Sequence, residues 1–167
     1  MRRSTLFPVL ALVPVLSLFA ARSAAAQPLG GALTGVGLLG SEEHGGAGLV
    51  DLYAEFGALR LGGGFGVAAV SDAADTHSRV FAPFGFSAAL LFGSRRGAAI
   101  ELRGRFGAWA GATDTGLGSG VWGSAGAWLR IGLGARAGIL FGLDAWFQSA
   151  VATPVYFAPG IGFGWTS

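Results

Sequence analysis

The chain has no cysteine and no lysine among its 167 residues. Without cysteine it can form neither a disulfide framework nor a thiolate metal site, and no acylated cysteine can tether it as a lipoprotein. Without lysine it has no G-x-x-x-x-G-K-[ST] phosphate loop, and a G-x-S-x-G nucleophile elbow is missing too. These absences exclude several common catalytic and binding sites.

Long apolar runs are scarce, with one exception at the N-terminus. Residues 6–20 are apolar, follow a basic start and precede three alanines that end at Ala26. The run is shorter than the roughly 20 residues that a membrane-spanning helix needs, and it contains two prolines. This pattern is typical of a cleaved secretory signal. We therefore expect residues 1–26 to be a signal peptide and residues 27–167 to form one domain.

Positive charge is also low once the signal is set aside. Three of the 11 basic residues belong to the signal, which leaves eight basic against nine acidic residues. A nucleic-acid-binding domain normally carries a basic excess that neutralises phosphates. We expect no nucleic-acid partner.

Glycine is abundant, with 31 residues that all follow residue 26, and the mean hydropathy is high at +0.59. Soluble domains are rarely so apolar. Because no run after residue 26 is long enough for a transmembrane helix, the apolar residues must be spread over many short segments. Strands that each turn one apolar face to lipid would account for both facts.

Apolar and polar residues alternate with period two along the chain, which predicts β-strands. The pattern is clearest at 50–56, 100–106 and 139–147, and weakest in the two segments richest in glycine and alanine, 32–40 and 120–131. Eight strands of about ten residues each are expected. They are 32–40, 50–56, 59–70, 80–92, 100–106, 120–131, 139–147 and 155–165.

Connections between these segments alternate in length. Four are polar or glycine-rich and about seven to nine residues long, namely 41–48, 71–78, 111–119 and 148–154. The other three, 57–58, 93–97 and 132–135, are tight. Such alternation is typical of a barrel with short periplasmic turns, longer outer loops and both termini in the periplasm. The expected fold is all-β, an eight-stranded antiparallel up-and-down transmembrane β-barrel.

The choice between lipid and water depends on which face of the strands points outward. A soluble barrel keeps its apolar face inside, whereas a membrane barrel turns that face to lipid. The apolar faces carry more Phe, Leu, Val and Ile than a narrow lumen could hold, and the opposite faces are mostly Gly, Ala, Ser and charged residues. We expect the apolar faces outside; a soluble periplasmic barrel is the alternative.

In this pattern the chain resembles the small outer-membrane β-barrel proteins, such as the OmpA transmembrane domain and OmpX-like proteins. Its last strand, 155–165, resembles their C-terminal insertion signal, although it ends in Thr166 and Ser167 instead of a terminal aromatic residue. The resemblance covers nearly all of residues 27–167 and implies an outer-membrane β-barrel domain there. It also implies a location in the cell outer membrane, contact with its lipids and lipopolysaccharide, and insertion by barrel-assembly machinery. We expect a monomer.

Eight charged residues fall on the faces expected to point inward. They are Asp51, Glu55, Arg60, Glu101, Arg103, Arg105, Arg130 and Asp144. Because unpaired charge inside a narrow barrel is costly, these four acids and four bases are predicted to form a lumen charge network. A partly wet lumen that passes ions or small solutes is the alternative.

A catalytic alternative lies in the expected outer loops. His77 precedes Ser78 and has Asp72 and Asp75 nearby, a set that could serve a lipid-modifying hydrolase or acyltransferase at the outer rim. Neighbouring His and Ser in sequence are more often solvated loop residues. We therefore expect no enzyme and no catalytic residue.

Neither a metal nor a cofactor is expected. His44 with Glu42 and Glu43 is a sparse ligand set that usually belongs to a solvated surface. Two windows, 35–40 and 118–123, match the dinucleotide pattern G-x-G-x-x-G, but neither opens a helix and a glycine-rich chain produces such matches by chance.

The large aromatic residues lie mostly towards the expected strand ends, where they could form an interface girdle or pack the lumen. They are Tyr53, Trp109, Trp122, Trp128, Trp146, Tyr156 and Trp165. The leading expectation for function is a non-enzymatic integral outer-membrane barrel with a structural or surface-contact role.

Overall fold

The computed structural model describes residues 28–167, apart from 73, 75–76, 95, 114–115 and 152–153. The expected signal peptide lies outside the described residues and stays a prediction. Within the described part, no helix is long and apolar enough to cross a membrane.

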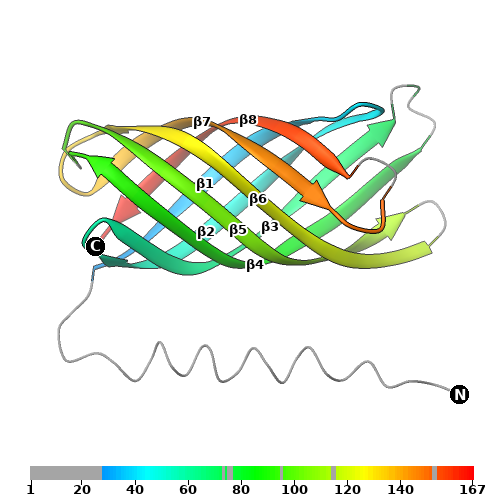
Figure 1. Ribbon diagram of the computed structural model, residues 1–167, viewed down its shortest axis with the longest axis horizontal. Coiled ribbons are helices and arrows are strands. Elements are labelled where there is room, and N and C mark those ends of the chain that lie inside the picture. Colours follow the sequence, from blue (N-terminus) through cyan, green and yellow to red (C-terminus); the bar gives the residue numbers. More distant parts are fainter. Residues whose placement is uncertain (1–27, 73, 75–76, 95, 114–115, 152–153) are drawn as a thin grey trace, which may run out of the picture.

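Eight strands form one closed barrel in sequence order (Figure 1). They are β1 (Leu29–Leu39), β2 (Glu43–Phe56), β3 (Leu59–Asp72), β4 (Ser78–Gly93), β5 (Ala98–Thr113), β6 (Gly116–Gly132), β7 (Ala137–Gln148) and β8 (Val155–Thr166). All neighbouring pairs are antiparallel, and β8 pairs with β1 to close the ring. The predicted up-and-down fold is confirmed, and closure leaves no unpaired strand edge.

The connections between strands distinguish the two ends of the barrel. The turn end carries the connections from β2 to β3, from β4 to β5 and from β6 to β7, together with the start of β1 and the end of β8. The other four connections lie at the loop end. Figure 1 shows the start of β1 and the end of β8 at the same end of the barrel, as the sequence predicts.

The predicted alternation of long and short connections is wrong. β2 begins at Glu43, which shortens the expected loop 41–48 to residues 40–42, and only residues 114–115 separate β5 from β6. Strand pairing continues through the glycine and polar residues at these positions, with Leu39 opposite His44 and Thr113 opposite Gly116. Pairing between neighbours therefore overrides the local preference of glycine for turns.

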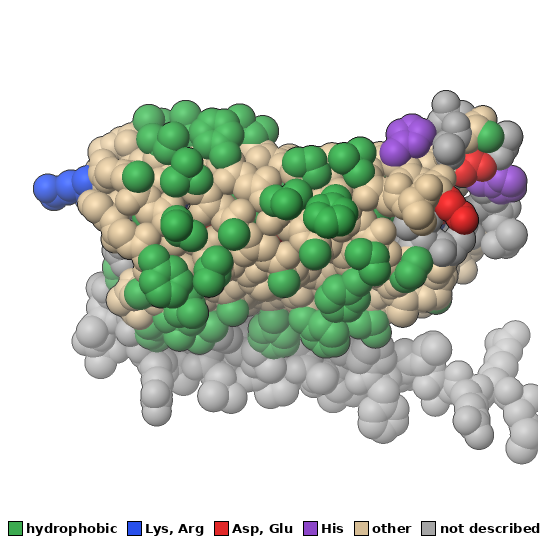
Figure 2. Space-filling model, turned by 45° about the horizontal axis from the view of Figure 1, so that its top comes forward, with side chains coloured by type: hydrophobic (Ala, Val, Ile, Leu, Met, Phe, Trp, Pro, Cys, Tyr) green, Lys and Arg blue, Asp and Glu red, His purple; other side chains and the backbone are tan. Residues whose placement is uncertain are grey.

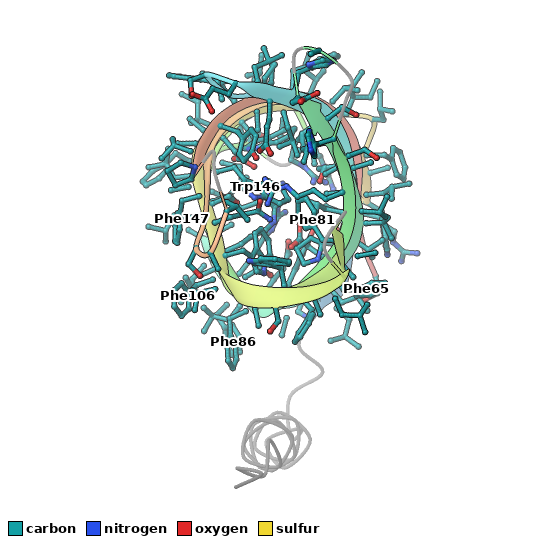
Figure 3. All side chains as sticks on the ribbon, turned by 90° about the vertical axis from the view of Figure 1, so that its right-hand side faces the viewer. Phe65, Phe81, Phe86, Phe106, Trp146 and Phe147 are labelled. Carbon is teal, nitrogen blue, oxygen red and sulfur yellow. The ribbon has the colours of Figure 1, made fainter. Side chains whose placement is uncertain are left out.

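Side chains alternate between the lumen and the exterior along each strand, as β4 shows most regularly. Figure 3 looks along the barrel, with Phe81 and Trp146 inside and Phe65, Phe86, Phe106 and Phe147 outside. Large apolar side chains cover the exterior, many of them more than 40% exposed. The reversed arrangement of a soluble barrel is therefore not found.

Candidate functional site in the barrel lumen

The side chains that fill the lumen form the candidate site, and charged residues make up its middle. All eight side chains of the predicted lumen network point inward and are at most 5% exposed. Arg60 places Nη2 2.7 Å from Glu55 Oε1 and Nη1 2.5 Å from Glu101 Oε2. Glu101 Oε1 also accepts a 2.9 Å hydrogen bond from Nε of Arg103. Strands β2, β3 and β5 thus contribute to one half of the network, which reaches across β4.

Arg105 joins the acids of the other half. Its Nη2 lies 2.8 Å from Asp51 Oδ2, and its Nη1 lies 2.9 Å from Asp144 Oδ2. Asp51 also lies 3.6 Å from Nη1 of Arg103, which links the two halves. Asp144 Oδ1 accepts a 2.8 Å hydrogen bond from Nε1 of Trp128. Seven charged side chains therefore form one chain of ion pairs across the lumen.

Arg130, the eighth charged residue, is not part of this chain of ion pairs. It is 1% exposed near the turn end of β6, and its Nε and Nη1 form no hydrogen bond with any residue that the structure describes. Gly164 on β8 gives it room, since a Cβ there would lie 2.7 Å from Nη1. The ion-pair chain holds four acids and three arginines, so Arg130 offsets its remaining negative charge.

A second charged cluster lies at the loop end and was not predicted from the sequence. Arg79 donates from Nη2 to Glu43 Oε2 at 2.7 Å and to the hydroxyl of Tyr156, which in turn donates to the same Glu43 oxygen. The polar residues around Glu43 predict a loop there, whereas the structure places it in β2. Arg79 could have been found, since the residue before the outward-facing Val80 must point inward.

An aromatic layer lies between these clusters along the strands. Trp146 follows Asp144 towards the loop end of β7, and Trp109 follows Arg105 on β5. Trp122 and Trp146 have ring centroids 4.8 Å apart, and Phe81 meets Trp109 edge to face at 5.8 Å. Six of the seven large aromatic residues considered above pack inside the lumen, whereas Trp165 is 37% exposed on the exterior.

Inward-facing glycines provide the space for these large side chains. A Cβ on Gly142 would lie 2.3 Å from Cδ2 of Trp128, and one on Gly160 would lie 2.8 Å from Cη2 of the same ring. A Cβ on Gly126 would lie 2.0 Å from the carboxylate of Asp144. The bulky lumen side chains therefore pack directly against the backbone of these glycines.

Three solved structures share this architecture. Neisserial surface protein A aligns with a TM-score of 0.66 and 10% identity, over 84% of this chain and 97% of that protein. The N-terminal β-barrel domain of Pseudomonas aeruginosa OprF gives 0.59 and 14%, over 84% and 98%. The attachment invasion locus protein Ail of Yersinia pestis gives 0.54 and 12%, over 86% and 100%.

The chain has the fold of the small outer-membrane β-barrels. At such low identity the likeness concerns the fold alone. No protein-family model matches the sequence, and no curated protein matches it either.

Free space inside the barrel is small where the charges meet. A cavity of about 10 Å³ lies beside Asp51, Tyr53, Arg60 and Glu101. A cavity of that size has room for one water molecule. The charged side chains of the network are at most 5% exposed, so they fill the middle of the lumen closely.

The rim residues considered for catalysis are only partly brought together. His77 Nδ1 lies 3.3 Å from Asp72 Oδ2, and the His77 side chain is 71% exposed. Ser78 begins β4 opposite Ser71, and Asp75 lies outside the described residues. An exposed His–Asp pair in water lacks the desolvated setting that activates a serine nucleophile.

The histidine considered for metal binding lies in a strand, which corrects its predicted place in a loop. His44 belongs to β2 and faces outward, while Glu43 points into the lumen and pairs with Arg79. The two side chains therefore lie on opposite faces of the barrel wall. Among the described residues, no group of three His, Asp or Glu side chains could hold a metal ion. The two G-x-G-x-x-G windows lie within or beside β1 and β6, which are strands without the helix that such a loop requires.

Trp128 offers a test of the lumen hydrogen bonds. Trp128→Phe keeps a ring against Gly142 but removes the donor to Asp144, so we expect a loss of about 1.5–3 kcal/mol in the free energy of unfolding. Urea titration followed by the fluorescence of the remaining tryptophans measures it. Trp165→Phe, which changes an exterior ring, is the matched control with a loss below about 0.5 kcal/mol. Equal losses in both variants would contradict a role for the Asp144 hydrogen bond.

Proposed function

We propose that the protein is a non-enzymatic integral protein of the outer membrane, with a packed lumen and a structural or surface-contact role. The observation that carries the proposal is the filled lumen, where an ion-pair chain and an aromatic layer occupy the space that a pore would need. An eight-stranded barrel has little bore to begin with. Contacts with other molecules are then left to the rims and the outer wall.

The exterior supports location in a membrane. Figure 2 shows hydrophobic side chains spread along the barrel wall and charged side chains or histidine only at its two ends. Phe65, Phe106 and Phe157 are each at least 56% exposed on this wall. Outer-membrane lipids, with lipopolysaccharide at the loop end, and barrel-assembly machinery during insertion are the partners that we propose for a monomer.

Gel mobility tests the membrane location directly. We expect the unboiled protein from an outer-membrane fraction to migrate as a folded barrel in SDS and to shift on boiling, because its hydrogen-bonded ring closes without free edges. A single unshifted band from the soluble periplasm would contradict the proposal. In planar bilayers the same preparation is expected to give no single-channel steps; regular steps would establish the wet-lumen alternative.

Lipid chemistry separates the proposal from the catalytic alternative. Among the described residues, the exposed pair of His77 with Asp72 is the arrangement that favours a lipid-modifying enzyme. We expect lipid A acylation to be the same in cells that carry the native protein and in cells that carry His77→Ala with Ser78→Ala. A change in acylation between the two would favour the enzyme.

A further inference from the structure

The two ends of the barrel carry opposite charge. The turn end exposes Arg96 and Arg136, while the loop end bears Glu42 and Asp72 among its exposed or half-buried side chains. Figure 2 shows this division, with basic side chains at one extremity and acidic side chains and histidine at the other. In the described part of the turn end, no exposed side chain is acidic, because Glu55 near the end of β2 points into the lumen and pairs with Arg60.

Backbone hydrogen bonds fix the two arginines on neighbouring turns. Gly132 N donates to Gly97 O at 2.7 Å, which joins the turn that holds Arg96 to the start of the turn that holds Arg136. Arg136 O accepts a 2.8 Å hydrogen bond from Thr166 N, so the second turn is tied to β8. The arginines are therefore carried by a rigid rim and not by long loops.

The apolar wall continues up to this rim. Leu29, Ile131, Leu133 and Trp165 are 65%, 43%, 55% and 37% exposed at the turn end. Leu133 and Arg136 belong to the same turn. An exposed apolar side chain therefore lies only three residues from an exposed charged one, as expected where the hydrocarbon of a membrane gives way to its headgroups. Arginines at that depth meet lipid headgroups, whose phosphate oxygens match the guanidinium fork.

We propose that the rim formed by Arg96 and Arg136 binds the phosphates of anionic phospholipids in the leaflet at the turn end. Zwitterionic lipids carry their own cation beside the phosphate, whereas anionic lipids leave a net negative charge. Two exposed arginines with no exposed acidic side chain beside them in the described part of the rim therefore prefer the anionic headgroup. The inference rests on the proposed membrane location and adds a lipid preference to one of the two rims.

Spin-labelled lipids test this preference in the folded protein reconstituted into phosphatidylcholine vesicles. The quantity measured is the association of labelled phosphatidylglycerol with the barrel relative to labelled phosphatidylcholine. We expect phosphatidylglycerol to be preferred at the rim by up to about fivefold for each arginine, and about 0.5 M salt to suppress the preference. Arg96→Gln with Arg136→Gln is expected to reduce the ratio to about one.

A charge at the opposite end of the barrel provides the control for this experiment. Glu42→Gln removes an exposed charge from the opposite end and is expected to keep the phosphatidylglycerol preference. Both arginine side chains are exposed, so the double variant should still show the heat-dependent gel shift. Immobilised lipid with an unchanged preference in the double variant would overturn the inference alone. Absence of immobilised lipid of either kind would overturn the proposed membrane location as well.

Discussion

Arg105→Met is expected to lower the free energy of unfolding by about 3–5 kcal/mol. Arg105 lies between Asp51 and Asp144, with nitrogen to oxygen distances of 2.8 and 2.9 Å, and its side chain is 1% exposed. Methionine keeps most of the volume but leaves two buried carboxylates without their shared cation. The cost is large because a buried charge that loses its partner cannot regain water. Urea unfolding of the refolded barrel in detergent or vesicles measures the loss.

A neutral triple variant separates charge from packing at this position. Asp51→Asn, Arg105→Met and Asp144→Asn together remove all three charges, while the amide oxygen introduced by Asp144→Asn can still accept the hydrogen bond from Trp128. We expect this variant to lose only about 1–2 kcal/mol, less than the single change. If the triple variant were the less stable of the two, the ion pairs themselves would be the main stabilising term and the argument from unpaired charge would fail.

Gly126→Val is expected to prevent formation of the heat-resistant barrel or to destabilise it by at least about 3 kcal/mol. A Cβ at this inward position would lie 2.0 Å from the Asp144 carboxylate and 2.2 Å from the carbonyl oxygen of Leu143. Both atoms belong to β7, so the added side chain must push β6 and β7 apart or break the ion pair of Asp144 with Arg105. Gel mobility before and after boiling, followed by urea titration of any folded fraction, measures the effect.

Gly35→Val is the matched control on the opposite face. No atom lies within 4 Å of a Cβ placed on Gly35, which is exposed on the outer wall. A β-branched residue fits an exposed apolar strand position, so we expect stability within about 0.5 kcal/mol of the native protein. If Gly35→Val lowered the stability as much as Gly126→Val, glycine would be needed at these positions for backbone conformation and not for lumen space.

Much of the wall could be predicted from the sequence because strand alternation is a local property. Residues 50–56 have the inside and outside positions that their period predicts, with Asp51, Tyr53 and Glu55 inward. The strand ends could not be found in this way. Glu43 and the glycines that follow it look like a loop locally, yet pairing with β1 and β3 extends the strand through them.

The sequence predicts which charged side chains face the lumen, but not which of them pair with one another. Alternation places Arg60, Arg105 and Arg130 inside, but their contacts depend on the tilt and stagger of strands that are distant in sequence. Arg105 reaches two carboxylates, whereas Arg130 has two nitrogens without a described partner. Likewise, the Trp residues near strand ends were compatible with a girdle until the closed ring placed four of them in the lumen.

We expect the order in which the barrel assembles to follow from the sequence separation of the residues that meet in the closed ring. Asp51 and Arg105 are 54 residues apart, Glu43 and Tyr156 are 113 apart, and the seam between β1 and β8 joins the two ends of the ring. Hairpins of neighbouring strands can form early, but pairs of such sequence separation need most of the ring in place. Glu55 and Arg60 can pair early, within the hairpin of β2 and β3, whereas Arg105 pairs with Asp51 and Asp144 on strands that are not its neighbours. We therefore expect these three charges to stay hydrated until the ring is nearly complete, so that their desolvation and their pairing occur together in one late step.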